Sequence, residues 1–310
     1  MAELELKNLL YDMKDPEGLV NDAELEYFSK LRDLAAQICE SGDIRVLLLA
    51  GPSASGKTTT ANILADMLKE RGKKSTVVSL DDFYRDSTDK KYPKLEDGTR
   101  DLESPAALDL DMLRGVISDI IAGREFDVPR YNFETGIRVE LTHYSSYDGG
   151  CVIIEGLHAL NPLISDSFSK ENVLKVFVSV STNINDGNRR ILSGRRMRFV
   201  RRVVRDSIYR ATTAEATVAM WQKVLRGEDR YLYPFKNLAD VRFDTFHAFE
   251  PAVLKSYALK LLTAQLREKS EYVNNIAKVL EKMPDYNEAL VPQTSLIREF
   301  IPGGVYEDLY

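Results

Sequence analysis

Cysteine and histidine are scarce in this 310-residue sequence. Its two cysteines, Cys39 and Cys151, lie far apart along the chain. They cannot supply the spacings of a disulfide framework or a zinc site. The three histidines, His143, His158 and His247, share no metal-ligand spacing, so we expect them to be structural or surface residues. The sequence predicts neither a cross-linked scaffold nor a histidine or cysteine metal centre.

Long apolar runs and an excess of positive charge are also missing. No run approaches the roughly 18 apolar residues that a transmembrane helix needs. The first residues are acidic where a secretory signal would be basic. Lys and Arg number 42 against 48 Asp and Glu, which gives a net charge of −6. Nucleic acid is therefore not the expected partner, although a local basic patch stays open. We expect a cytoplasmic protein with no membrane contact.

Five short apolar segments stand out against this background. They show little alternation, which is typical of strands buried on both faces of a parallel sheet. Helical patterns separate most of them, so the fold class is predicted as α/β. The predicted strands are residues 44–50, 75–80, 151–155, 173–180 and 239–244.

Helix signals surround these strands. Residues 22–38 have apolar residues at helical spacing, with Asn21 or Asp22 as N-cap. Ser104-Pro105 is predicted to open a helix that ends at Gly123. Thr212–Glu215 fits a capping box for a helix that Gly227 ends. The apolar positions of the first helix are Leu25, Phe28, Leu31, Leu34 and Ile38.

The chain length predicts roughly two domains, at about 150 residues each, or one domain with appendages. We divide the chain into an N-terminal helical segment (1–40), a core domain (41–250) and a C-terminal helical extension (251–310). The extension is predicted either to contact a second copy of the chain or to cover an edge of the sheet.

A phosphate-binding loop follows the first strand. Residues 51–58, GPSASGKT, satisfy the pattern G-x-x-x-x-G-K-[ST] between an apolar strand and a helix. Glycines let backbone N–H groups close around phosphate oxygens at a helix N-terminus. Lys57 would hold the β- and γ-phosphates and Thr58 would ligate Mg²⁺. This pattern alone does not distinguish a kinase from a GTPase or an ATP-driven machine.

Carboxylates end two of the predicted strands. Asp81 and Asp82 follow the second strand and Glu155 closes the third. Ligands gather at the carboxyl ends of strands in an open α/β sheet. One acid that accepts a proton and another near Mg²⁺ suffice for phosphoryl transfer to an alcohol. Asp81 is the better candidate base; the alternative is that these acids cap the segments that follow.

These motifs resemble a known family. SLDDFYRD at 79–86, together with GPSASGKTT and IIEG, is similar to the uridine kinase and phosphoribulokinase family of P-loop kinases, over residues 44–245. The resemblance implies a P-loop NTPase fold of the NMP-kinase type. That fold has a five-stranded parallel sheet, an inserted β-hairpin and an arginine-rich lid helix. It also implies an ATP- and Mg²⁺-dependent kinase that phosphorylates the 5′-hydroxyl of a nucleoside, with uridine or cytidine as the first candidate substrates.

The resemblance also assigns roles to residues. It implies catalysis by Asp81, Lys57 and Arg205. The Mg²⁺ ligands would be Thr58, Asp81 and Glu155. ATP would contact Gly51, Ser53, Ala54, Ser55, Gly56, Lys57, Thr58, Thr59, Arg202, Arg205 and Arg210. The nucleoside would contact Asp81, Tyr84, Glu103, Tyr131, Phe133, Arg138 and Arg202.

The lid is expected at about residues 185–230, in an arginine-dense helical stretch over 185–210. Arg198, Arg202 and Arg205 would share one helical face because they lie three and four residues apart. The hairpin is expected from FDVPRYNF and IRVEL, on either side of Glu134-Thr135-Gly136.

Two features depart from the uridine kinases. Gly136 stands where they carry a base-reading histidine, and this is expected to remove a hydrogen-bonding group and leave room. Arg210-Ala211-Thr212 stands where their lid has Arg-Gly-Arg. The patterns N-F-x-T-G and SLIREFI are similar to a bacterial uridine kinase-like subgroup that is often fused to a threonyl-tRNA-synthetase-like domain, which this sequence lacks. Two alternatives stay open. One is a kinase of another alcohol, such as a sugar phosphate or pantothenate, using Arg130 and Arg138. The other is a non-catalytic nucleotide- or RNA-binding module that uses the arginine helix.

Overall fold

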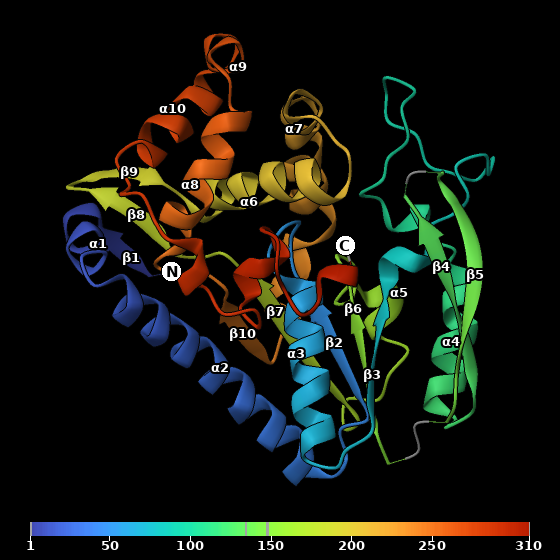
Figure 1. Ribbon diagram of the computed structural model, residues 1–310. Helices are drawn as coiled ribbons and strands as arrows, with labels where there is room; N and C mark the ends of the chain where they lie inside the picture. Colours follow the sequence, from blue (N-terminus) through green and yellow to red (C-terminus); the bar gives the residue numbers. More distant parts are fainter. Residues whose placement is uncertain (1, 134, 147–148, 310) are drawn as a thin grey trace.

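A five-stranded parallel sheet forms the centre of the computed structural model, which describes residues 2–133, 135–146 and 149–309 (Figure 1). Its strand order is β10-β7-β2-β6-β3. The five strands lie within two residues of the predicted segments, so the α/β prediction is confirmed. They are β2 (Val46–Ala50), β3 (Ser75–Ser79), β6 (Cys151–Glu155), β7 (Val173–Ser179) and β10 (Val241–Asp244).

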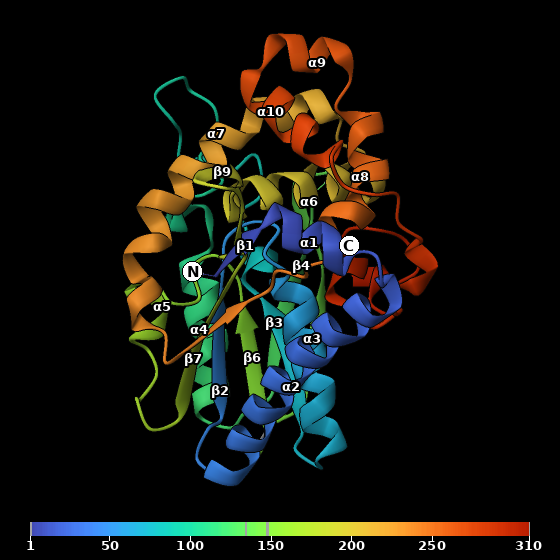
Figure 2. The same ribbon diagram turned by 90° about the vertical axis from the view of Figure 1, so that its left-hand side faces the viewer.

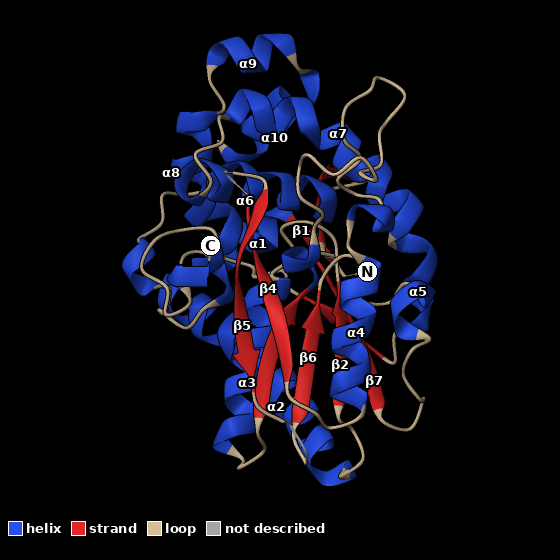
Figure 3. Ribbon diagram, turned by 90° about the vertical axis from the view of Figure 1, so that its right-hand side faces the viewer, coloured by secondary structure: helices blue, strands red, loops and turns tan. Residues whose placement is uncertain are grey.

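Side chains of the central strand β2 alternate between two hydrophobic clusters. Leu47 and Leu49 enter one, and Val46 and Leu48 enter the other. Helices α2 (Pro16–Ser41) and α3 (Lys57–Glu70) cover the first face (Figure 2). Helix α4 (Leu110–Ile121) and the short α5 (Pro162–Ser165) cover the second, beside the hairpin (Figure 3). Because both faces are covered, all five residues of β2 are buried.

The predicted hairpin is confirmed as an antiparallel pair, β4 (Phe126–Asn132) and β5 (Ile137–Tyr144). Glu134 of its turn lies outside the described residues. The hairpin and the 3₁₀ turns η1 (Leu80–Phe83) and η2 (Pro105–Ala107) lie on the α4 side of the sheet.

Helices from the second half of the chain lie over the carboxyl ends of the strands, as Figure 1 shows. They are α6 (Gly194–Tyr209), α7 (Ala214–Tyr231), α8 (Glu250–Leu261), α9 (Ala264–Lys269) and α10 (Glu271–Leu280). Turns η3 (Tyr233–Leu238), η4 (Glu288–Leu290), η5 (Leu296–Glu299) and η6 (Glu307–Leu309) connect or follow them. No helix in the described part of the chain is long and apolar enough to cross a membrane.

The N-terminal helix prediction was wrong in its start. Helix α2 begins at Pro16, and the side chain of Asp15 accepts a hydrogen bond from Gly18 N (3.1 Å) as its cap. Aspartate before proline at the first helical position is itself a start signal. Leu25, placed on the apolar face, is 62% exposed, whereas Glu24 faces inward. Before α2 lie α1 (Leu6–Asp12) and β1 (Glu3–Glu5).

Three later predictions also need correction. Ser104 caps only η2, and Asp109 caps α4. Residues 185–210 are not wholly helical, because β8 (Asn183–Asp186) and β9 (Arg189–Leu192) form a small sheet with β1 before α6 begins. Helix α7 continues through Gly227 to Tyr231. A Cβ at Gly227 would lie 2.2 Å from Glu103 Cβ, so this glycine permits a close approach and does not end the helix.

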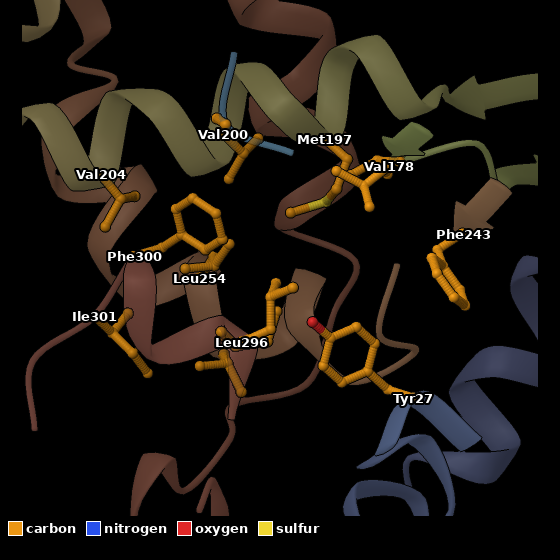
Figure 4. Close-up of a cluster of buried hydrophobic side chains, with 14 of the residues drawn as sticks. Tyr27, Val178, Met197, Val200, Val204, Phe243, Leu254, Leu296, Phe300 and Ile301 are labelled. Carbon is orange, nitrogen blue, oxygen red and sulfur yellow. The ribbon is translucent and has the colours of Figure 1, made fainter. Parts of the chain in front are cut away.

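Residues 251–310 pack into the same hydrophobic cluster as α2, α3 and α6. Figure 4 shows Leu254, Leu296, Phe300 and Ile301 beside Val200 and Val204 of α6. All four are fully buried or nearly so. This segment therefore contributes directly to the core of the molecule.

Candidate active site

The phosphate-binding loop connects β2 to α3 in a conformation that needs its glycines. Gly56 has a φ of 84°, and a Cβ on it would lie 2.5 Å from Leu296 Cδ1. A Cβ on Gly51 would lie 2.4 Å from the carbonyl oxygen of Val178. Ala54 also takes a positive φ of 56°. Such a turn directs successive N–H groups inward, which makes a concavity for an anion.

Hydrogen bonds join this loop to the ends of the neighbouring strands. Glu155 Oε1 accepts hydrogen bonds from Thr58 Oγ1 (3.2 Å) and from Ser79 Oγ (2.8 Å). Residues Ser79 and Glu155 lie opposite each other in the pairing of β3 with β6. Lys57 Nζ donates to the carbonyl oxygen of Pro52 (3.3 Å), across the loop. The parallel register thus places Glu155 beside the first turn of α3.

Asp81 lies at the same edge of the sheet, in turn η1 after β3. Its backbone N–H donates to Ser79 Oγ (3.3 Å). Its neighbour Asp82 instead accepts a hydrogen bond from Tyr131 N (3.1 Å), and so holds the hairpin. Burial raises the pKa of Asp82 to about 6. The two adjacent acids therefore have different surroundings, and only Asp82 is engaged by the hairpin backbone.

The oxygen atoms at this edge fit a magnesium ion. Burial raises the pKa of Glu155 to about 7; the charge of Lys57 opposes this rise and that of Asp81 adds to it. Mg²⁺ is commonly held by one or two carboxylates together with substrate phosphates. Thr58, Asp81 and Glu155 offer that donor set. The described residues contain no group of three or more His, Cys, Asp or Glu that could hold a metal unaided.

An aromatic cluster joins the hairpin to the segment that follows Asp81. The ring centroid of Tyr131 lies 5.5 Å from that of Tyr84 and 5.0 Å from that of Phe133. Tyr84 Oη donates to the carbonyl oxygen of Leu102 (2.9 Å). Phe133 is 56% exposed, and the guanidinium of Arg210 lies 5.7 Å above its ring. The structure brings these predicted substrate residues together.

Glu103 lies where helix α7 approaches the cluster, beside Gly227. Burial raises its pKa to about 7, although the charge of Arg202 lowers it. The buried ring of His158 hydrogen-bonds to the backbone of Glu103, and burial lowers the pKa of His158 to about 4. His158 is therefore a neutral structural residue beside the site.

Two hairpin positions do not match their predicted surroundings. Arg138 Nη1 donates to Asp109 Oδ2 (3.1 Å), so the guanidinium is engaged at the start of α4. Gly136 leaves no open room, because a Cβ there would lie 2.9 Å from Ser87 Cβ. Its φ of 70° and the bond from Ser87 N to Gly136 O (2.7 Å) explain the glycine as a backbone requirement.

Helix α6 directs some of its arginines toward the loop. Arg198 Nη1 donates to Ser53 O (2.8 Å), and Arg202 Nη1 donates to Ser53 Oγ (2.9 Å). Arg205 is held by Asp206 Oδ1 (2.7 Å). Arg198, Arg202 and Arg205 therefore share one helical face, as their spacing predicted.

Sequence reasoning missed the acids that hold these arginines. Glu228 of α7 is fully buried, accepts two bonds from Arg198 (2.7 and 2.8 Å) and accepts another from Ser53 N (2.9 Å). Glu228 lies seven residues after Trp221 and four residues after Val224, on the same face of the helix. This position was a usable signal, because an acid on a buried face needs a partner.

A second missed acid comes from residues 251–310. Glu299 Oε2 accepts a hydrogen bond from Thr59 Oγ1 (2.7 Å), and its Oε1 lies 3.7 Å from Arg205 Nη1. Thr59, a predicted ATP residue, is thus bound to the C-terminal extension.

Comparison with known proteins identifies the family. The sequence model of the phosphoribulokinase/uridine kinase family matches residues 46–249, which is more than half of the chain. The chain belongs to this family. It is accordingly a kinase that transfers phosphate from ATP to an alcohol, as the resemblance predicted.

Individual relatives are distant. The uridine kinase of Deinococcus deserti is 28% identical over 230 residues, which cover 73% of this chain and 98% of that protein. The uridine kinase of Halobacterium salinarum is 24% identical over 194 residues, with 62% and 76% covered. A solved structure described as a possible uridine kinase from Bacillus stearothermophilus is 20% identical, with a TM-score of 0.43, and covers 69% of this chain and 100% of that one.

Proposed function

We propose that this phosphoribulokinase/uridine kinase family member is a Mg²⁺-dependent nucleoside kinase that phosphorylates the 5′-hydroxyl. The observation that carries the proposal is that the charge of Asp81 raises the pKa both of Glu155 at the loop edge and of Tyr84, which belongs to the aromatic cluster with Tyr131 and Phe133. Aromatic faces suit a planar nucleobase. The relatives named uridine kinase make uridine and cytidine the first substrates to test.

In this proposal Asp81 accepts the proton of the attacking hydroxyl. Lys57 and the N–H groups of the loop hold the β- and γ-phosphates in line with that hydroxyl. Arg202 and Arg205 stabilise the charge that develops on the transferring phosphoryl group. Thr58, Glu155 and Asp81 would hold Mg²⁺, which neutralises phosphate charge when bound.

Glu103 would face the ribose. Its raised pKa keeps the carboxyl partly protonated near neutral pH, so it can donate as well as accept a hydrogen bond to a ribose hydroxyl. We keep Arg138 as a wall of the acceptor site rather than a direct contact, because Asp109 engages its guanidinium.

The two alternatives from the sequence have less support. Arg130 pairs with Glu140 (3.3 Å) and Arg138 with Asp109, so neither offers an unpaired cation for an acceptor phosphate. The RNA-binding alternative depends on the arginines of helix α6, of which Arg198, Arg201 and Arg205 are buried. Arg195 is exposed but pairs with Asp229.

The test is ADP release with ATP and Mg²⁺ across uridine, cytidine, adenosine, guanosine, inosine, pantothenate and ribulose 5-phosphate. Asp81→Asn should bind ATP normally yet lose kcat by about 10²–10⁴-fold, since the general base is gone. The matched control is Asp82→Asn, the same change one residue on, which should retain most activity. Equal kcat in Asp81→Asn and wild type would refute the base, and turnover only on a sugar phosphate or pantothenate would refute the nucleoside.

A further inference from the structure

A cationic groove lies between the β8–β9 hairpin and helix α10. Figure 1 shows these elements packed together, on the opposite side of the molecule from the β4–β5 hairpin. The groove has a cavity of about 170 Å³. Its lining residues are Arg189, Arg190, Ile191, Arg196, Asn275, Lys278, Val279 and Lys282. Five of the eight are cations and none is a carboxylate.

The positive charge of this cationic groove is only partly neutralised. Within the described part of the chain, the side chains of Arg189 and Lys278 are exposed and form no ion pair. At the rim Lys282 pairs with Asp186 (2.9 Å), and Arg190 Nη2 lies 3.9 Å from a carboxylate oxygen of Glu3. Like charges around one hollow raise the local potential and attract an anion.

The groove also has a fixed shape. Arg196 Nη1 donates to the carbonyl oxygen of Ile191 (3.0 Å), and its guanidinium lies 5.8 Å from the ring centre of Tyr272. Ile191 and Val279 are buried and form an apolar floor. A guanidinium held in this way loses little rotamer freedom when it binds a phosphate oxygen.

We propose that the cationic groove binds a small anion with two or more phosphate groups. Three cations of the groove, Arg189, Arg196 and Lys278, form no ion pair within the described residues, so a ligand with several negative charges is expected. The size of the hollow suits a small molecule. The net charge of −6 disfavours the long phosphate backbone of a nucleic acid. The proposal does not depend on which alcohol the kinase phosphorylates.

The single tryptophan reports on this groove. Trp221 Nε1 donates to Tyr272 Oη (3.0 Å), and Tyr272 is the ring beside Arg196. An anion on Arg196 should therefore change the fluorescence of Trp221. Arg198 also lies over Trp221 (5.5 Å). Anion binding at the phosphate-binding loop can therefore change the same fluorescence, so the experiment must prevent it.

The experiment uses Lys57→Ala as the background, which weakens phosphate binding at the loop. Inorganic triphosphate is titrated without Mg²⁺ while Trp221 fluorescence is followed. We expect saturable binding, and a Kd at least about tenfold weaker when Arg189→Ser and Lys278→Ser are added, because two binding cations are lost. The control adds Lys170→Ser and Lys236→Ser, which remove the same charge from exposed sites elsewhere and should leave the Kd unchanged.

The absence of saturable binding in the Lys57→Ala background would overturn the proposal, and so would equal weakening in the groove and control variants. A single-stranded RNA that binds through Arg189 and Lys278 more tightly than triphosphate would overturn the small-anion assignment. Circular dichroism melting checks that each variant is folded. If the groove variant does not fold, Lys278→Ser alone should weaken binding about threefold, and an unchanged Kd would then count against the site.

Discussion

The arginines in the first half of helix α6 differ from those in its second half, taken with the C-cap residue Arg210, in how many carboxylates each group contacts. Arg198 pairs with Glu228 and Arg201 with Glu250, and all four side chains are almost fully buried. Arg202, Arg205 and Arg210 instead converge on Asp206, with Arg202 Nε at 3.1 Å and Arg210 Nε at 3.9 Å.

This difference distinguishes arginines whose charge is neutralised by a carboxylate from arginines whose charge is available to a bound phosphate. A buried arginine with its own carboxylate is neutralised and holds two elements together. Three guanidiniums around one aspartate leave positive charge, even with Glu299 3.7 Å from Arg205. That remaining charge faces the phosphate-binding loop, where Arg202 contacts Ser53. Helix α6 thus combines buried ion pairs, which hold it to its neighbours, with a positively charged surface that faces the phosphate-binding loop.

Arg201→Met should break the structural half with the largest effect. Glu250 would remain buried without its cation, and one of its oxygens already lacks a hydrogen bond in the described structure. The free energy of unfolding should fall by about 3–5 kcal/mol, measured by urea denaturation. The double variant Arg201→Met/Glu250→Leu should recover most of that loss, because it removes both charges.

The same variant should show a distinctive pH dependence. Burial raises the pKa of Glu250 to about 7, above its ordinary 4.5, even though Arg201 opposes the rise. A folded-state pKa above the unfolded one means that the folded state is favoured at low pH and loses stability as pH rises through 7. Without Arg201 the stability loss should be larger at pH 8 than at pH 5. A loss independent of pH would contradict a charged Glu250.

Arg205→Gln should break the phosphate-facing half. Asp206 keeps Arg202 as a partner and Glu299 keeps Thr59, so the unfolding free energy should fall by less than in Arg201→Met, by about 1–3 kcal/mol. The kcat should fall by about 10²–10³-fold, which is roughly 3–4 kcal/mol, if Arg205 stabilises the transferring phosphoryl group. Steady-state kinetics and urea denaturation on the same sample measure both. A stability loss as large as that of Arg201→Met would remove the distinction between the two halves.

Arg210→Gln should have the smallest effect. Its charge lies over Phe133 at 5.7 Å, and the side chain is partly exposed. We expect the KM for the acceptor to rise a few-fold, about 0.5–1 kcal/mol, with kcat little changed. Phe133→Leu should raise KM to a similar degree. A large fall in kcat in either variant would instead assign Arg210 the role expected of Arg205, which is to stabilise the transferring phosphoryl group.

Sequence patterns predicted the strands and motifs that a short, continuous stretch of sequence specifies. The apolar runs predicted the five strands, and the loop motif, Asp81 and Glu155 lie at one edge because parallel strands end together. The brief β8–β9 pair was missed because its four-residue strands lie within an arginine-rich stretch that resembles a helix.

Partners set by tertiary packing were not predictable in this way. Arg198 and Glu228 are 30 residues apart, and Arg201 and Glu250 are 49 apart. No local spacing connects them. Gly227 was misassigned for the same reason, since its role depends on the approach of Glu103.

The contact between Thr59 and Glu299 has a consequence for the order of events during synthesis. The two residues are separated by 240 positions, and Leu296 packs directly on Gly56 of the phosphate-binding loop. A ribosome therefore makes the loop about 240 residues before it makes the residues that support it. The nascent chain must hold an incomplete nucleotide site over that interval, and the site matures only after Leu296 and Glu299 have emerged.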